Sequence, residues 1–388
     1  MTQNPRIRLL FAASATIFFT RAMLFSTWQS RAPEVQQMLH LNTAQMGLLA
    51  MLYPAGGLLG LLNANYLNQR FGSRRVTVVG FALAAVGLAT LGFTVPAGSL
   101  PLTAITLVLM GLPMGVADFI GNFEGADVDR KATRSLLPAI HSIFGIGMMA
   151  AAGIASLLSA SSVSLTTNYL LVAIVVALPS VWAGITFPKR AATIEGPESK
   201  AQHRATSRKV WTEPVTWIVA AVAFAFGLAE LSAGTWVTIA LAGIGMTNAE
   251  AAAAFGLFWI AITVGRIFGG FAVDKIGLRR TLIVSAVATA VGVSMFTLNQ
   301  QLHLPYLALI VWGLGMANGI PLAINAMSDH SPMSAARINM IITICYASML
   351  SAGPALGALG QVVGIQLAFG LPVALLVVAA FLARVVRR

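Results

Sequence analysis

The sequence predicts an all-α integral membrane protein with twelve transmembrane helices in two pseudo-symmetric six-helix bundles. Of its 388 residues, 57% are hydrophobic and only 9% are charged, whereas soluble domains carry about 25% charged residues. The apolar residues fall into twelve runs, each close to the roughly 20 residues that cross a bilayer. A short basic segment also recurs at half the chain length, since Gly72 and Gly277 are each followed by two arginines. Lipid therefore surrounds most of the chain, and the two halves are related.

The runs divide into two sets of six. The first set, within residues 1–187, comprises Leu9–Arg31, Ala44–Leu67, Val76–Val95, Leu102–Ala126, Ser135–Leu158 and Asn168–Phe187. We interpret the first run as an uncleaved transmembrane helix. Residues 188–213 form a polar linker with six Lys/Arg. The second set, within residues 214–388, comprises Val215–Ala240, Ala251–Val273, Thr281–Leu298, Pro305–Met327, Asn339–Leu359 and Val362–Ala383.

The positions of the basic residues predict the orientation. If the N-terminus is cytoplasmic, the cytoplasmic segments hold 21 of the 24 Lys/Arg, and the outer loops hold none. The other three, Arg21, Arg31 and Arg266, lie within runs or at their edges. Cytoplasmic loops of membrane proteins are enriched in Lys and Arg. We therefore expect both termini and the linker in the cytoplasm, and we attribute the net charge of +12 to topology rather than to nucleic acid.

Ionisable side chains inside the runs are the candidate functional residues, because charges are costly in hydrocarbon. Arg21 lies about twelve residues into the first run, far from either surface, and Trp28 shares its helical face. In the fourth run, Asp118 and Asn122 continue a stripe of small residues. We expect Arg21 and Asp118 to face a polar cavity, with a structural salt bridge as the alternative. Glu124 is expected to join a charge network in the following loop.

Further polar candidates lie on other runs. His141, in the fifth run, is either a proton carrier or a packing residue. Glu230, in the seventh, is flanked by glycines, and we expect it to be functional. For Arg266, in the eighth, a structural role is favoured. Asn318 and Asn325 share one face of the tenth run, where they either line a cavity or join helices.

The two basic segments carry a specific motif. They are Gly270–Arg280, GFAVDKIGLRR, and Asn65–Arg75, NYLNQRFGSRR. With six helices on each side of a linker, the chain resembles the major facilitator superfamily, whose motif here is GxxxD[RK]xGx[RK][RK]. The second copy matches at Gly270, Asp274, Lys275, Gly277, Arg279 and Arg280, and the first keeps Arg70, Gly72, Arg74 and Arg75. Asp274 is interpreted as part of a conformational latch, with plain topogenic charge as the alternative. Gln69 replaces the acid of the first copy, so its latch is expected to be weaker.

The resemblance implies a major facilitator fold whose central cavity is lined by the first, fourth, seventh and tenth helices. Most of the buried polar candidates lie on those four helices. Within the family, the chain is similar to the fucose-permease-like branch and its uncharacterised bacterial inner-membrane relatives. The shared features include W-x-x-R-x-P at Trp28, Arg31 and Pro33, HSIFGIG in the fifth run and PLAINAMSD in the tenth. That branch implies a substrate or proton role for Asp118. It also carries an acid late in the first helix, where this chain has Gln29.

These observations predict a secondary transporter of a small polar solute, sugar-like or an organic anion, in the bacterial inner membrane. Asp118 and Glu230 are the candidate proton carriers, and Arg21 is the counter-charge or anion anchor. The alternative is a proton-coupled drug or metabolite efflux antiporter, although the glycine-proline motif of such antiporters occurs in the eleventh run rather than the fifth. An intramembrane enzyme and a transport-inactive receptor are less favoured.

The expected partners are a small-molecule substrate, protons and the lipid bilayer. We expect a monomer that binds no nucleic acid. The single cysteine, Cys345, excludes an internal disulfide, and no Cys/His cluster suggests a metal. The sequence also lacks the GxxxxGK[ST] nucleotide motif. No cofactor is therefore expected.

Overall fold

The computed structural model describes residues 5–131, 137–188, 208–298, 304–328 and 333–386. The chain divides into two compact units. Unit 1 comprises Met1–Asn42, Leu52–Thr193 and Gly245–Gly256, and unit 2 comprises Thr43–Met51, Ile194–Ile244 and Leu257–Arg388. The boundaries at 187 and 214 that we expect from the sequence remain a prediction.

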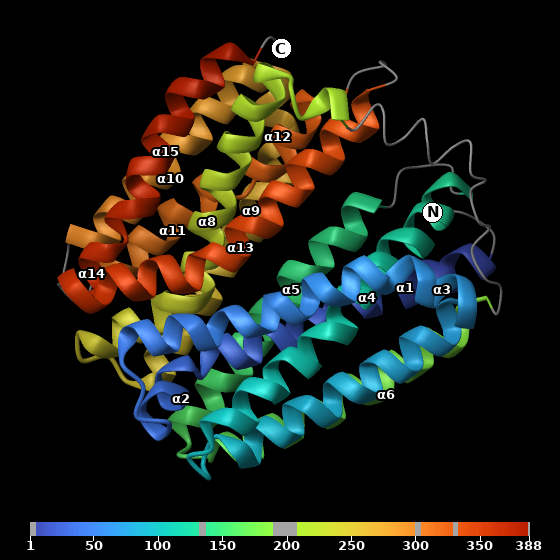
Figure 1. The fold of residues 1–388 in the computed structure, drawn as a ribbon, viewed down its shortest axis with the longest axis vertical. Coiled ribbons are helices and arrows are strands. Elements are labelled where there is room, and N and C mark those ends of the chain that lie inside the picture. Colours follow the sequence, from blue (N-terminus) through green and yellow to red (C-terminus); the bar gives the residue numbers. More distant parts are fainter. Residues whose placement is uncertain (1–4, 132–136, 189–207, 299–303, 329–332, 387–388) are drawn as a thin grey trace. The chain divides into compact units, whose positions relative to one another are not determined.

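Unit 1 is packed around its first helix, α1. This helix contacts α4, α5 and α6 (Figure 1). A Cβ on Gly147 of α5 would lie 2.4 Å from the carbonyl oxygen of Phe19, so the two helices approach at backbone distance. The helices of this unit are α1 (Pro5–Ser30), α2 (Ala32–Met38), most of α3 (Thr43–Thr94), α4 (Leu100–Lys131), α5 (Leu137–Ala160) and α6 (Leu165–Thr186).

Helix α3 contains two of the predicted helices. It is 52 residues long, about 78 Å at 1.5 Å per residue, which is more than twice a hydrocarbon core of about 30 Å. Its helical geometry is interrupted only at Gly72, where φ is 77° and ψ is 154°. Glycine reaches this region without steric cost because it has no Cβ. The predicted runs Ala44–Leu67 and Val76–Val95 are therefore joined through one glycine.

The second basic segment has the same construction. α9 (Asn248–Ile276) ends and α10 (Leu278–Leu298) begins on either side of Gly277, whose φ is 82°. The predicted runs stop several residues short of each glycine, whereas the helices extend up to it on both sides. The arginines that follow each glycine lie in the first turn of the next helix, because a single residue with positive φ is enough to redirect the chain.

Unit 2 is packed around α8 (Pro214–Gly243). It contacts α12, α13 and α15. Glu213 precedes Pro214 at the start of α8, where proline is favoured because its missing N–H would be unpaired there. The other helices are most of α9, with α10, α11 (Leu304–Met316), α12 (Gly319–Ala326), α13 (Ser334–Val363), α14 (Ile365–Ala368) and α15 (Gly370–Leu382), followed by the 3₁₀ turn η1 (Ala383–Val385). The tenth predicted helix is thus divided at residues 317–318.

The helices are long and apolar enough to make the protein a multi-pass membrane protein. Among the described residues, eleven helical stretches meet the length and hydropathy needed to cross a bilayer, and the double length of α3 gives the twelfth span. Large apolar side chains such as Leu62, Leu178 and Leu298 are exposed on the outside of their units. In water this would be unfavourable, whereas in lipid it carries no penalty.

Candidate functional site

The structure pairs Arg21 with Asp118 inside unit 1. Arg21 lies midway along α1 and Asp118 lies on α4, and the guanidinium Nη1 contacts the carboxylate Oδ1. The two side chains are 18% and 26% exposed. The guanidinium carbon also lies 5.1 Å from the ring centroids of Phe18 and Phe144, a cation–π geometry. An ion pair with two aromatic faces and partial access to the surroundings therefore occupies the middle of a membrane span.

Helix α4 holds this carboxylate close to α3. A Cβ on Gly115 would lie 1.7 Å from the carbonyl oxygen of Gly57, so the predicted stripe of small residues does allow two helices to approach closely. One turn further, the Asn122 amide donates to the backbone oxygen of Asp118 at 2.8 Å and to its Oδ1 at 3.2 Å. The partners of the Asp118 carboxylate thus include one charged group, on Arg21, and one neutral group, on Asn122.

His141 lies beside the same pair. Its ring is 4.7 Å from the Phe18 ring, with the planes tilted by 54°, and its side chain is exposed. Because Phe18 also contacts Arg21, three of the predicted candidates from three different helices gather here: Arg21, Asp118 and His141.

The end of α1 has a different role. Trp28 and Gln29 are each 3% exposed, and Arg31 directly follows the helix. The Arg31 Nε lies 2.6 Å from a carboxylate oxygen of Glu34, and its Nη2 donates to the carbonyl oxygen of Val163 at 3.2 Å. The W-x-x-R-x-P signature therefore forms a buried junction between α1 and α2.

Unit 2 contains a second, looser acid–arginine pair. Glu230 on α8 lies 3.9 Å from Arg266 Nη2 on α9, which is longer than a hydrogen bond. Arg266 Nε also donates to the carbonyl oxygen of Ala317 at 3.3 Å, at the break between α11 and α12. Arg266 therefore bridges Glu230 to this break.

Asn318 lies at the same break and joins two helices. Its amide donates to the carbonyl oxygen of Gly265 at 2.8 Å, and a Cβ on Gly269 would lie 2.1 Å from its Oδ1. Of the two roles considered for this asparagine, the structure shows the helix contact. Asn325 is exposed near the end of α12.

The latch residues of the second basic segment lie at the surface. Asp274 is exposed, and it makes no ion pair with any part of the chain that the structure describes. Lys275 Nζ lies 5.9 Å from the Phe271 ring centroid. Arg279 and Arg280 are exposed and, within the described ranges, have no acidic partner. The pairing that would make Asp274 a latch remains a prediction.

The first basic segment is held by polar contacts within unit 1. Gln69, in place of the usual acid, donates to Asn65 Oδ1 at 3.2 Å. Arg70 donates to the Tyr66 hydroxyl at 2.6 Å, and Arg74 donates to the carbonyl oxygen of Phe187 at 3.2 Å. These contacts tie the segment to its own helix and to the end of α6.

Glu124 is the residue whose place the sequence analysis got wrong. We expected it in a loop charge network, but α4 continues to Lys131 and Glu124 is only 2% exposed. It accepts a hydrogen bond of 2.5 Å from Ser73 Oγ, directly after Gly72. An acid from α4 therefore reaches the start of the second half of α3. Glu124 already lies within the predicted run Leu102–Ala126, and this position was the signal for its burial.

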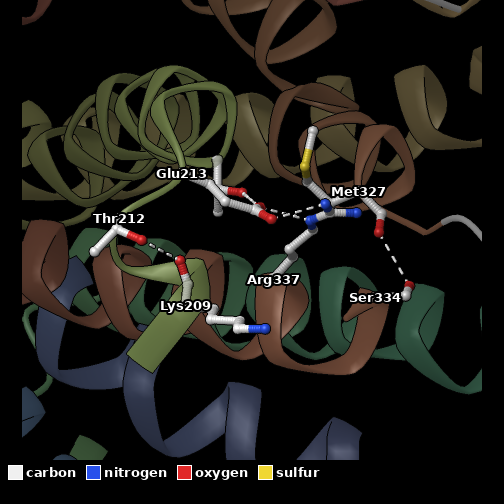
Figure 2. Close-up of polar contacts among 7 residues, drawn as sticks. Lys209, Thr212, Glu213, Met327, Ser334 and Arg337 are labelled. Atoms are coloured by element: carbon white, nitrogen blue, oxygen red, sulfur yellow. Dashed lines mark hydrogen bonds and ion pairs between the residues drawn. The ribbon is translucent and has the colours of Figure 1, made fainter. Parts of the chain in front are cut away.

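A further pair, not predicted from the sequence, joins the starts of α8 and α13. Arg337 donates from Nε and Nη2 to the two carboxylate oxygens of Glu213 at 2.8 and 3.0 Å (Figure 2). Thr216 also donates to Glu213 at 2.8 Å. On the neighbouring turn, Ser334 donates to the carbonyl oxygen of Met327 at 3.0 Å. This bidentate pair fastens the ends of two long helices within unit 2.

Comparison with known proteins identifies the family. The family model described as the Major Facilitator Superfamily matches residues 10–354 and 243–388. An uncharacterized MFS-type transporter of Yersinia pestis is 25% identical over 382 residues, covering 96% of this chain and 94% of that protein.

Solved structures share the fold at low sequence identity. The nucleoside transporter NupG matches with a TM-score of 0.76 and 14% identity, over 97% of this chain and 98% of NupG. The transporter FucP matches with a TM-score of 0.66 and 16% identity, over 97% of this chain and 98% of FucP.

Proposed function

The chain belongs to the major facilitator superfamily, and from that premise we propose that it is a proton-coupled secondary transporter of a small polar solute. Transport across a membrane is the activity that its family and its fold indicate. The proposal adds three finer statements: the solute is sugar-like or an organic anion, movement occurs by alternating access, and protons supply the driving force. The Arg21–Asp118 pair is the observation that carries it.

The position of this pair is the reason. A charged side chain within a membrane span is expensive unless it is paired or reaches a wet cavity, and such residues mark substrate or proton pathways. Arg21 and Asp118 meet the first condition, because they pair with each other, and their partial exposure of 18% and 26% is compatible with the second.

The pair suggests how protons and solute are coupled. When Asp118 is charged, it holds the Arg21 guanidinium. When Asp118 takes up a proton, the guanidinium loses its counter-charge and can bind hydroxyl or carboxylate oxygens of a solute. The ring faces of Phe18 and Phe144 beside it suit the apolar face of a sugar-like ring. Glu230, held at 3.9 Å by Arg266, is the second candidate proton carrier.

The proposed location is the bacterial inner membrane, with both termini in the cytoplasm. The distribution of Lys and Arg along the chain supports this orientation. Cysteine labelling tests it directly, because Cys345 is the single cysteine. In a Cys345→Ser background, a cysteine placed at Arg388 should react with a membrane-impermeant maleimide only after the cells are opened. Reaction in intact cells would show the opposite orientation, with the C-terminus outside the cytoplasm.

A ligand screen comes before the transport assay. Thermal shifts of the purified protein are measured with sugars, sugar acids, nucleosides and cationic drugs. Stabilisation by a sugar, a sugar acid or a nucleoside supports the proposal. Stabilisation by cationic drugs alone would favour the efflux antiporter instead.

The stabilising compound is then used in proteoliposomes. With a pH gradient, the wild-type protein should concentrate the solute, whereas Asp118→Asn should lose accumulation and keep solute exchange. Glu250→Gln, which changes an exposed acid at the start of α9, is the matched control and should accumulate normally. Accumulation by Asp118→Asn would exclude Asp118 as the proton carrier, and a lack of flux in the wild type would reject transport of that compound.

A further inference from the structure

A long apolar groove follows the outer surface of unit 2 between α10 and α15. These two helices pack together along their length (Figure 1). The groove has a volume of about 760 Å³, and apart from Ser294 and Arg384 its lining is apolar. On α10 the lining begins at Ile283 and ends at Leu298, and on the other side it begins at Val373 and ends at Arg384.

The length of the groove suits an acyl chain. From Ile283 to Leu298, α10 rises about 22 Å at 1.5 Å per residue. One leaflet of the hydrocarbon core is about 15 Å thick, half of the whole. A lipid chain that enters from one surface therefore fits within the groove. Val291 and Val377, on opposite walls, remain 48% and 44% exposed, so apolar surface is available to it.

One end of the groove is positively charged. Arg384 closes the groove there, and its guanidinium carbon lies 4.8 Å from the Phe381 ring centroid. The 3₁₀ turn that carries Arg384 packs against α10. The first turn of α10 adds Arg279 and Arg280, one turn before Ile283. Across the ranges that the structure describes, none of these three arginines has an ion-pair partner.

We propose that this groove is a binding site for one anionic phospholipid. The acyl chain lies between α10 and α15, and the phosphate binds at Arg384, with Arg279 and Arg280 adding positive potential. Basic pockets at the ends of transmembrane helices recognise anionic headgroups, and guanidinium groups bind phosphate oxygens in a bidentate manner. A zwitterionic lipid would leave this concentration of positive charge uncompensated. The site is separate from the Arg21–Asp118 pair, so it does not depend on the transport proposal.

Native mass spectrometry of the purified protein tests this site. Dioleoyl phosphatidylglycerol is titrated against dioleoyl phosphatidylcholine, and bound lipid is counted. We expect one phosphatidylglycerol to be retained under conditions that remove phosphatidylcholine. A basic residue near a headgroup is worth about 1 kcal/mol, so Arg384→Ala should weaken phosphatidylglycerol binding about fivefold. Arg208→Ala removes an exposed charge that does not line the groove and should change nothing.

Neighbouring valines on α15 separate the groove from general lipid contact. Val377→Trp fills the groove and should abolish the retained lipid. Val378→Trp is the matched control, because Val378 is 52% exposed but does not line the groove. Each variant is first checked for a wild-type unfolding temperature without added lipid, and Val377→Leu replaces Val377→Trp if that variant is destabilised.

Three results would overturn the proposal. One is equal retention of both lipids, which would indicate ordinary annular lipid. Another is unchanged binding in both Arg384→Ala and the Val377 variant. The third is a change of oligomeric state in the Val377 variant without loss of lipid, which would assign the groove to an interface between copies of the chain.

Discussion

Replacing Arg21 and Asp118 singly and together measures how strongly this pair holds unit 1. Arg21→Met and Asp118→Leu each leave one charge without its partner inside the membrane span. Breaking a fully buried pair in this way costs about 3–5 kcal/mol. Because the side chains are 18% and 26% exposed, solvent screening reduces the loss of stability. We therefore expect each single variant to lower the free energy of unfolding by about 2 kcal/mol.

The double variant should behave differently from the sum of the two. A well-packed apolar pair often replaces a buried ion pair without net loss, so the double variant should lie within about 1 kcal/mol of wild type, a coupling of about 3 kcal/mol. The assay is thermal unfolding in detergent followed by tryptophan fluorescence. At about 2–4 °C per kcal/mol, each single variant should lower the midpoint by about 4–8 °C, and the double variant should recover most of that loss.

Glu124 provides the control for this cycle. It lies on α4 like Asp118 but accepts a hydrogen bond from Ser73. Combining Arg21→Met with Glu124→Gln should therefore give the sum of the two single effects. If the Arg21 and Asp118 changes also simply add, the two charges do not stabilise each other, and the reasoning from their contact is refuted.

Two further predictions concern positions in the basic segment and the Glu213 pair. Gly277→Ala should destabilise the folded protein by about 1–2 kcal/mol, because alanine resists a positive φ. Gly270→Ala lies in a helical position with open space around it, so it should be neutral or should stabilise the protein by up to about 1 kcal/mol. Equal effects of the two variants in thermal unfolding would contradict the assigned backbone geometry. Arg337→Gln should lower the stability of the fold by about 1.5–3 kcal/mol, the value of hydrogen bonds to a charged group. Once Arg337 is changed, Glu213→Gln should lower the stability little further. If the two effects instead add in the double variant, measured in the same assay, the pair is rejected.

Much of the fold could be predicted from the sequence, with specific exceptions. The helices around Arg21, Asp118 and Glu230 lie where the apolar runs place them. The predicted runs left the basic segments outside the helices because these segments are polar, but α3 and the α9–α10 connection are each interrupted at one glycine of positive φ. Glu124 was assigned to a charge network in the loop after its run, whereas α4 continues to Lys131 and buries this side chain.

The candidate site was predictable in its members but not in its pairings. Arg21 and Asp118 were both found from their depth in apolar runs, and whether they pair depends on how α1 and α4 are rotated. His141 contacts the ring of Phe18, which also contacts Arg21. A structural role was favoured for Arg266, and its contacts to Glu230 and to the break after α11 could not be predicted from the sequence.

In the two basic segments, too, the sequence predicts the residues and the structure shows their contacts. Comparison of the two halves in sequence identifies the repeated glycine and arginines. It also shows that Gln69 stands in the first copy where the second copy has an acid. Only the structure shows that Ser73, in the first copy, donates to an acid of another helix, whereas Asp274, in the second copy, is exposed.

The sequence by itself determines a membrane protein of twelve spans in two related halves, because the length and polarity of each run are local properties that lipid selects directly. The tertiary structure alone decides which charges meet: Arg21 with Asp118, Arg266 with Glu230, and Arg337 with Glu213. The physical reason is that a pairing depends on helix rotation and on the close approach that residues such as Gly115 and Gly147 permit. These distances are set between helices far apart in the chain.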